Sequence, residues 1–159
     1  MRLLEVHPGS LRLWPAAGPP QGDDGPAQRG EIPEADASGL RVLIVEDEFF
    51  IALDIEASLA SLGHTIVGIA VSADTAVRMA ERERPDVVLM DIRLAGSRDG
   101  VDAAEEIYDR FGIRSVFVTA NTDPQTRQRA AAVSPIGFLE KPLNLQRLRA
   151  ALDQLSGQA

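Results

Sequence analysis

The feature that most constrains the fold is an alternation of short apolar runs with amphipathic segments, which begins at Leu40 and continues almost to the end of the 159-residue chain. The runs are rich in Val, Ile, Leu and Phe and have the length of strands: residues 40–46, 65–71, 86–91, 115–120 and 136–141. They lack the regular polar alternation of a half-exposed strand. This pattern indicates a parallel sheet that is covered on both faces.

A helix is predicted after each run. The helices are expected from about Glu48 to Leu62, from Ser72 to just before Pro85, from about Val101 to Phe111, from Pro124 to about Val133, and after Asn144. Ser72, Asp123 and Asn144 are predicted N-caps. The last helix is expected to carry Leu145, Leu148, Leu152 and Leu155 on one face. Five strands that alternate with five helices predict an α/β fold, a doubly wound three-layer sandwich.

Residues 1–38 differ from the rest of the chain. They contain six of the ten prolines, with glycine and acidic residues between them, and no strand or helix period continues for long. We expect a disordered tail here and a folded domain over residues 39–156. Two alternatives stay open for this stretch: a short docking peptide at Leu11–Trp14, or an over-long start to a protein that begins near Gly39.

Composition narrows the possible partners. The formal net charge is −8, no basic block is present, and aromatic residues make up only 4% of the chain. These values argue against a nucleic acid or an anionic membrane as a partner. The absence of cysteine excludes disulfides and thiolate metal sites, and no apolar run approaches the roughly 20 residues of a membrane span. We expect a cytoplasmic protein without a signal peptide.

Polar residues follow four of the predicted strands. Glu46 and Asp47 end the first strand, Asp91 the third, Thr119 the fourth and Lys141 the fifth. Ligands of doubly wound sheets bind outside the carboxyl ends of the strands, so the three carboxylates converge if the first and third strands are neighbours. Mg²⁺ prefers oxygen ligands and retains water, while Lys141 and Thr119 can donate to phosphoryl oxygens. The pattern predicts a magnesium site that handles phosphoryl groups.

The set Glu46-Asp47, Asp91, Thr119-Ala120 and Lys141-Pro142, each at a predicted strand end, resembles the receiver domain of two-component response regulators. The resemblance covers about residues 40–155. It implies a flavodoxin-like five-stranded parallel sheet in the order 2-1-3-4-5, and a phosphoacceptor signalling protein rather than an enzyme. Because the last predicted helix ends a few residues before the sequence does, we expect a single-domain, stand-alone receiver whose output passes through a partner.

The resemblance also implies roles for individual residues. Asp91 would accept the phosphoryl group from a phosphohistidine of a sensor histidine kinase or a histidine phosphotransfer protein. Glu46, Asp47, Asp91 and the backbone carbonyl of Arg93 would hold Mg²⁺. Lys141 would bind phosphoryl oxygens, and its bond to the following proline would be cis, which X-Pro bonds adopt at low cost.

A switch is implied as well. Thr119 would contact the phosphoryl group, and Phe138 stands where the family usually has the aromatic residue that moves inward on phosphorylation. A downstream protein would then bind the face made by the helix at 124–133, the strand at 136–141 and the last helix. We expect a monomer or a weak homodimer.

Several residues depart from the commonest family pattern. Ala95 stands where proline is usual, the loop before Gly100 is one residue longer, and the acidic pair is Glu-Asp rather than Asp-Asp. Arg93 and Asn121 occupy the two variable positions that flank the phosphoryl group. These departures bear on the lifetime of the phosphate rather than on the basic chemistry.

Other interpretations compete with this one. Glu46 to Glu48 could be a solvated helix N-terminus, where the helix dipole favours acidic residues. A haloacid-dehalogenase-type phosphatase also uses a strand-end Asp and Mg²⁺, but it needs a second carboxylate two residues later, where this chain has Arg93. The chain could also be a phosphate sink, or a docking module that acts without phosphorylation.

Overall fold

The structure, a computed structural model, describes residues 39–120 and 122–157. The elements in chain order are β1 (Arg41–Val45), α1 (Phe49–Ser61), β2 (Thr65–Ala70), α2 (Ala73–Glu83), β3 (Val87–Asp91), α3 (Gly100–Phe111), β4 (Ser115–Thr119), α4 (Pro124–Ala132), β5 (Gly137–Glu140) and α5 (Leu145–Ser156). Every predicted strand and helix is present, with ends that shift by one or two residues. The tail predicted over residues 1–38 lies outside the described residues, as does Asn121.

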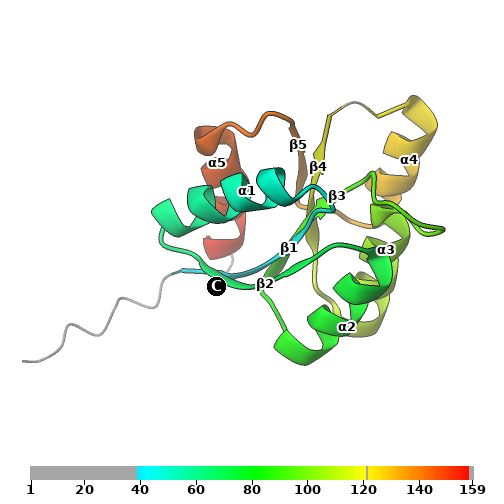
Figure 1. Ribbon diagram of the computed structural model, residues 1–159, viewed down its shortest axis with the longest axis horizontal. Coiled ribbons are helices and arrows are strands. Elements are labelled where there is room, and N and C mark those ends of the chain that lie inside the picture. Colours follow the sequence, from blue (N-terminus) through cyan, green and yellow to red (C-terminus); the bar gives the residue numbers. More distant parts are fainter. Residues whose placement is uncertain (1–38, 121, 158–159) are drawn as a thin grey trace, which may run out of the picture. The chain divides into compact units, whose positions relative to one another are not determined.

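All neighbouring strands pair in parallel, and the sheet order is β2-β1-β3-β4-β5. Helices α1 and α5 cover one face of the sheet, and α2, α3 and α4 lie on the other (Figure 1). The doubly wound fold and its strand order are therefore confirmed. Of the helices in the described part of the chain, none is long and apolar enough to cross a membrane.

The central strands are mostly apolar because both of their faces are covered. Along β1, Val42 and Ile44 enter the core beneath α1 and α5, whereas Leu43 and Val45 enter the core beneath α2 and α3. This alternation follows from the period of two in a strand. All five residues of β3 are buried. The strand that carries Asp91 is thus fixed from both sides.

Helix caps agree with the sequence in each predicted case. The side chains of Ser72, Asp123 and Asn144 accept hydrogen bonds from backbone N–H groups in the first turns of α2, α4 and α5. Leu145, predicted to share a face with Leu148, is 44% exposed. It occupies the first position of α5, one turn before Leu148, where the buried part of the apolar face begins.

Helix α4 is held mainly by polar contacts. Ala130 is its only buried residue. Arg129 donates to Asp99 Oδ2 at 2.9 Å and to Asp102 Oδ1 at 2.8 Å, which ties α4 to the N-terminus of α3. Burial alone would raise the pKa of Asp99, but the hydrogen bond from Arg129 and those from nearby backbone amides outweigh burial and lower it. A helix attached in this way can shift without disrupting a large apolar core.

The chain makes a close backbone contact behind Asp91. The Gly100 N–H donates to the Ile92 carbonyl at 2.9 Å. A Cβ atom at Gly100 would lie only 1.9 Å from the carbonyl oxygen of Asp91. The first residue of α3 therefore has to be glycine for the helix to approach the end of β3.

We expect Gly100→Ala to lower the free energy of unfolding by about 1–3 kcal/mol, the usual cost of forcing extra atoms into a packed site. Gly137→Ala is the matched control, since a Cβ there meets nothing within 4 Å. Urea denaturation of both variants measures the effect. Equal stability of the two variants would contradict the close approach at Gly100.

Candidate functional site

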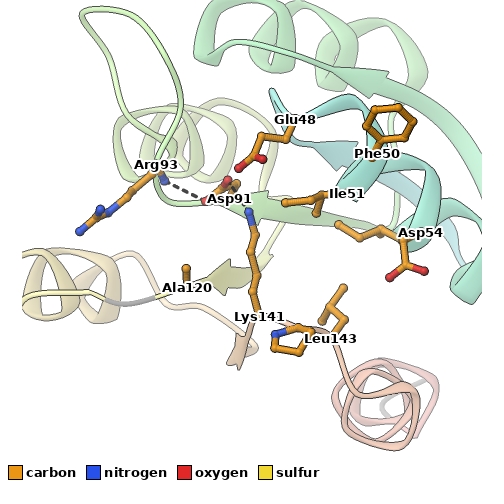
Figure 2. Close-up of a pocket in the computed structure, with 11 residues that line it drawn as sticks. Glu48, Phe50, Ile51, Asp54, Asp91, Arg93, Ala120, Lys141 and Leu143 are labelled. Atoms are coloured by element: carbon orange, nitrogen blue, oxygen red, sulfur yellow. Dashed lines mark hydrogen bonds and ion pairs between the residues drawn. The ribbon is translucent and has the colours of Figure 1, made fainter.

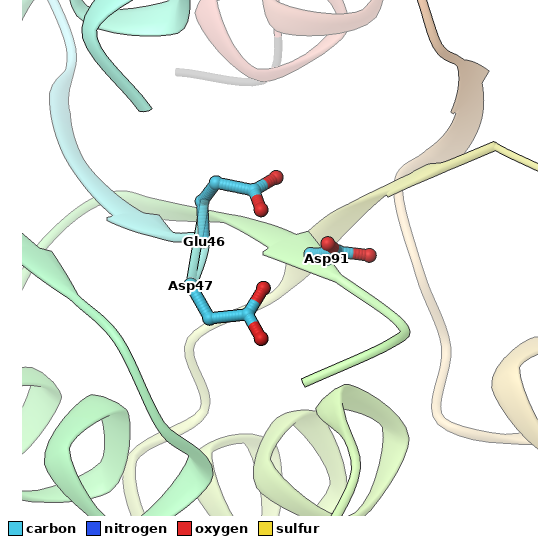
Figure 3. A group of neighbouring side chains, drawn as sticks. All are labelled: Glu46, Asp47 and Asp91. Carbon is cyan, nitrogen blue, oxygen red and sulfur yellow. The ribbon is translucent and has the colours of Figure 1, made fainter. Parts of the chain in front are cut away.

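Three carboxylates meet at the carboxyl ends of β1 and β3, which are adjacent strands. Glu46 and Asp47 follow β1, and Asp91 is the last residue of β3. One oxygen from each lies within 4.8 Å of the other two (Figure 3). Glu46 is only 1% exposed and Asp91 4%, whereas Asp47 is exposed to solvent. The cluster is thus buried on one side and open on the other.

Lys141 connects two of these carboxylates. Its Nζ atom lies 2.7 Å from Glu46 Oε2 and 2.8 Å from Asp91 Oδ2. The lysine follows β5 directly and extends to Asp91 at the end of β3 (Figure 2). The bond between Lys141 and Pro142 is cis, as expected.

A backbone N–H group also donates to one oxygen of each carboxylate. Arg93 N–H donates to Asp91 Oδ1 at 2.9 Å, and Glu48 N–H donates to Glu46 Oε1 at 3.0 Å. Ala95 N–H donates to Asp47 Oδ2, also at 3.0 Å, and so ties the β3–α3 loop to the end of β1. These bonds fix the orientation of all three carboxylates before any ligand binds.

The site has a net negative charge that suits a divalent cation. Burial raises the pKa of Glu46, although the hydrogen bond from Lys141 opposes this effect. Burial would lower the pKa of Lys141, but its bonds to Asp91 and Glu46 outweigh burial and raise it. When all are ionised, three carboxylates and one ammonium group sum to −3 + 1 = −2. The hard oxygen donors and this charge fit Mg²⁺.

A cavity of about 650 Å³ opens beside Asp91 and Lys141. Phe50 and Ile51 of α1 and Leu143, just before α5, form apolar parts of its wall. The Arg93 side chain also lines this cavity, and its guanidinium group points away from Asp91 (Figure 2). Phe50 was missed by the sequence reasoning although it is 82% exposed. The available signal was an aromatic residue off the apolar stripe of α1, three residues after Asp47.

Thr119 and Phe138 lie apart from the carboxylate cluster. The Thr119 hydroxyl is 2.6 Å from the hydroxyl of Thr122, in a hydrogen bond that either group can donate. Both threonines line a second, smaller cavity together with Phe138. The Phe138 ring is half-buried and stacks on Phe117, with 5.5 Å between ring centroids. Thr119 and Phe138 therefore line a cavity whose walls include none of the three carboxylates.

Comparison with known proteins agrees with the fold. The family model of the response regulator receiver domain matches residues 42–153. The chain belongs to this family. The signal receiver domain of a modulated diguanylate cyclase from Desulfovibrio desulfuricans is similar in structure, with a TM-score of 0.72 and 35% identity over 76% of this chain and 95% of that domain.

Two curated relatives share the receiver region. The transcriptional regulatory protein PdtaR of Mycobacterium tuberculosis is 37% identical over 125 residues, which is 78% of this chain and 60% of PdtaR. The phyllosphere-induced regulator PhyR of Methylorubrum extorquens is 34% identical over 114 residues, which is 71% of this chain and 42% of PhyR. The matched region is thus about half the length of these relatives.

The carboxylate cluster generates a metal-binding prediction. Loss of even an outer-shell partner costs roughly 10–100-fold in metal affinity, so we expect Asp47→Asn to weaken Mg²⁺ binding at least about tenfold. Asp54→Asn is the matched control, because Asp54 lines the same cavity but is not part of the three-carboxylate cluster. Calorimetric titration with Mg²⁺ provides the measurement. Equal affinities of the two variants would exclude Asp47 as a ligand.

Proposed function

We propose that this receiver domain accepts a phosphoryl group on Asp91 from a sensor histidine kinase or a histidine phosphotransfer protein, and that phosphorylation changes its affinity for a downstream protein. The observation that supports this most directly is Lys141 Nζ between Glu46 and Asp91, at the open edge of a three-carboxylate cluster. On this proposal the chain acts as a phosphoacceptor in a two-component system rather than as an enzyme with a separate substrate.

In the proposed transfer, an Asp91 oxygen attacks phosphorus and forms a P–O bond. The P–N bond to the donor histidine breaks, and its electron pair leaves with the imidazole. Lys141 is placed to exchange its contact with Asp91 for one with an incoming phosphoryl oxygen, because its ammonium group already lies 2.8 Å from Asp91 Oδ2. The Arg93 N–H holds the other Asp91 oxygen during the approach. Positioning and charge stabilisation are the main requirements of phosphoryl transfer.

Mg²⁺ fits this site through Asp47, Asp91 and Glu46, with the Arg93 carbonyl as the backbone ligand that the family resemblance implies. A bound Mg²⁺ would offset the negative charge of the carboxylates and of the phosphoryl oxygens. Glu46 is held by Lys141 and by the Glu48 N–H, which suits a role directly on the ion or through a water. Asp47 is the most exposed of the three, so on this proposal it binds the ion directly.

Incubation with acetyl phosphate and Mg²⁺ is expected to add one phosphoryl group per chain, detected by intact mass. Asp91→Asn retains the shape of the side chain but not its nucleophilic charge, so labelling should disappear, whereas Asp54→Asn should be labelled like the wild type. Excess chelator should also prevent labelling. Labelling of the Asp91 variant at the wild-type level would contradict Asp91 as the phosphoacceptor.

The switch begins at Thr119. In the structure its hydroxyl is paired with Thr122, and on this proposal it leaves that partner when it contacts a phosphoryl group on Asp91. Helix α4 begins five residues later, at Pro124, and has a single buried residue. We therefore propose that phosphorylation shifts the surface formed by α4, β5 and α5, where a downstream protein binds.

Thr119→Ala is expected to uncouple this response while leaving Asp91 able to take phosphate. Amide NMR with a beryllofluoride phosphate mimic measures it. In the wild type, shifts should extend from the loops around Asp91 into residues 124–145, and in the variant they should stay near Asp91. If wild-type shifts never reach residues 124–145, the switch is wrong and a phosphate-carrier role is favoured.

A further inference from the structure

A second cavity, of about 270 Å³, lies on the surface that the proposed switch would change. Its walls come from the end of β4 and the segment after it, from α4, from β5 and from α5: Thr119, Thr122, Arg127, Phe138, Glu140 and Arg147. We call it the α4–β5–α5 cleft. It shares Ala120 with the cavity beside Asp91. Ala120 thus lies between the cavity beside Asp91 and this cleft.

Two arginines give the cleft a charge opposite to that of the whole chain. Arg127 comes from α4 and Arg147 from α5, and Glu140 is the acidic residue in the wall. Their charges sum to +2 − 1 = +1, in a chain whose formal net charge is −8. Arg129 and Arg98 each pair with carboxylates on other elements, whereas within residues 39–120 and 122–157 no ion pair is found for Arg127 or Arg147.

The cleft also has an ordered wall. The Arg127 guanidinium carbon lies 5.2 Å from the centroid of the Phe138 ring, which holds the arginine over a half-buried aromatic surface. Such stacking orients a guanidinium group and leaves its N–H edge available for hydrogen bonds. The cleft therefore offers one guanidinium group stacked on an aromatic ring and a second arginine in its wall.

Phosphorylation would change the hydrogen-bond donors of this cleft. Thr119 and Thr122 share one hydrogen bond in the structure. When Thr119 turns to the phosphoryl group, as the proposed function requires, Thr122 loses its partner and its hydroxyl becomes available to a ligand in the cleft. A group bound by Thr122 in turn favours the state in which Thr119 is turned away, since coupling between two sites is reciprocal.

We propose that the α4–β5–α5 cleft binds a carboxylate side chain from an acidic segment of the downstream protein, and that it binds more tightly once Asp91 is phosphorylated. This inference rests on the proposed function. Arg127 and Arg147 supply charge-assisted hydrogen bonds to the carboxylate, and Thr122 supplies a third donor in the phosphorylated state. A local charge of +1 is balanced by one carboxylate, whereas a phosphate dianion would leave Glu140 facing excess negative charge.

The test uses the full-length chain, labelled with ¹⁵N, and the blocked peptide acetyl-Glu-Glu-Glu-Glu-amide at fixed ionic strength. The Nε–Hε signals of Arg127 and Arg147 and the amide of Thr122 are followed by NMR, with and without Mg²⁺ and beryllofluoride. We expect these three signals to shift, and the affinity to rise at least about fivefold with beryllofluoride, the low end of typical allosteric coupling. Equal affinity in both states, or shifts confined to other surfaces, would overturn the inference.

Matched charge variants separate the cleft from general attraction. Arg147→Gln and Arg127→Gln should each reduce binding strongly. Arg149→Gln removes the same charge from α5 outside the cleft, next to Asp153, and should bind like the wild type. Equal losses in Arg147→Gln and Arg149→Gln would mean unspecific electrostatic binding and would contradict the site.

Further measurements identify the ligand of the cleft and distinguish this inference from the proposed function. Tighter binding of a phosphoserine peptide of equal length would overturn the carboxylate assignment, and dimerisation on beryllofluoride addition, seen by sedimentation, would assign the cleft to a second copy of the chain. Acetyl phosphate labelling is measured on the same samples. Labelled protein that does not bind the peptide refutes this inference alone, whereas absent labelling refutes the proposed function.

Discussion

The site depends on one ammonium group. Lys141 Nζ neutralises parts of two nearly buried carboxylates at once, and each of those contacts is shorter than 3 Å. Without it, Glu46 and Asp91 would face each other as like charges in a poorly solvated position, which is energetically costly. Even with this lysine, the site has a net negative charge that a divalent cation can balance. On the proposed function, the position of Lys141 links the charge of Asp91 to metal and phosphoryl binding.

The fold places this group across large distances in sequence. Lys141 is 95 residues from Glu46 and 50 from Asp91. They meet because β1 and β3 are neighbours and β5 lies two strands beyond β3, all with their carboxyl ends at one edge. Close packing at Gly100 and the hydrogen bonds from Arg93 and Ala95 then hold the loop that follows Asp91. The sheet positions the carboxylates and Lys141, while α4, which has one buried residue, is the helix that the proposed switch would shift.

Much of this arrangement was predictable from the sequence because it follows from regular periods. The apolar runs predicted the strands, and Ser72, Asp123 and Asn144 predicted helix starts from their capping chemistry. The polar strand ends predicted that Glu46, Asp47 and Asp91 would meet once the strand order was known. Individual side-chain contacts and exposures follow no such period. The Thr119–Thr122 pair, the ties of Arg129 to α3 and the exposure of Leu145 depend on packing geometry that a local pattern does not encode.

A crystal structure with Mg²⁺ and beryllofluoride is the most direct test of the central claim that Lys141 and the carboxylates form a phosphoacceptor site. The account predicts beryllium on an Asp91 carboxylate oxygen, Mg²⁺ against Asp47 and Asp91, and Lys141 Nζ moved from Asp91 to a fluorine atom. An adduct on another residue, or Lys141 still bridging Glu46 and Asp91 beside an unmodified Asp91, would contradict it.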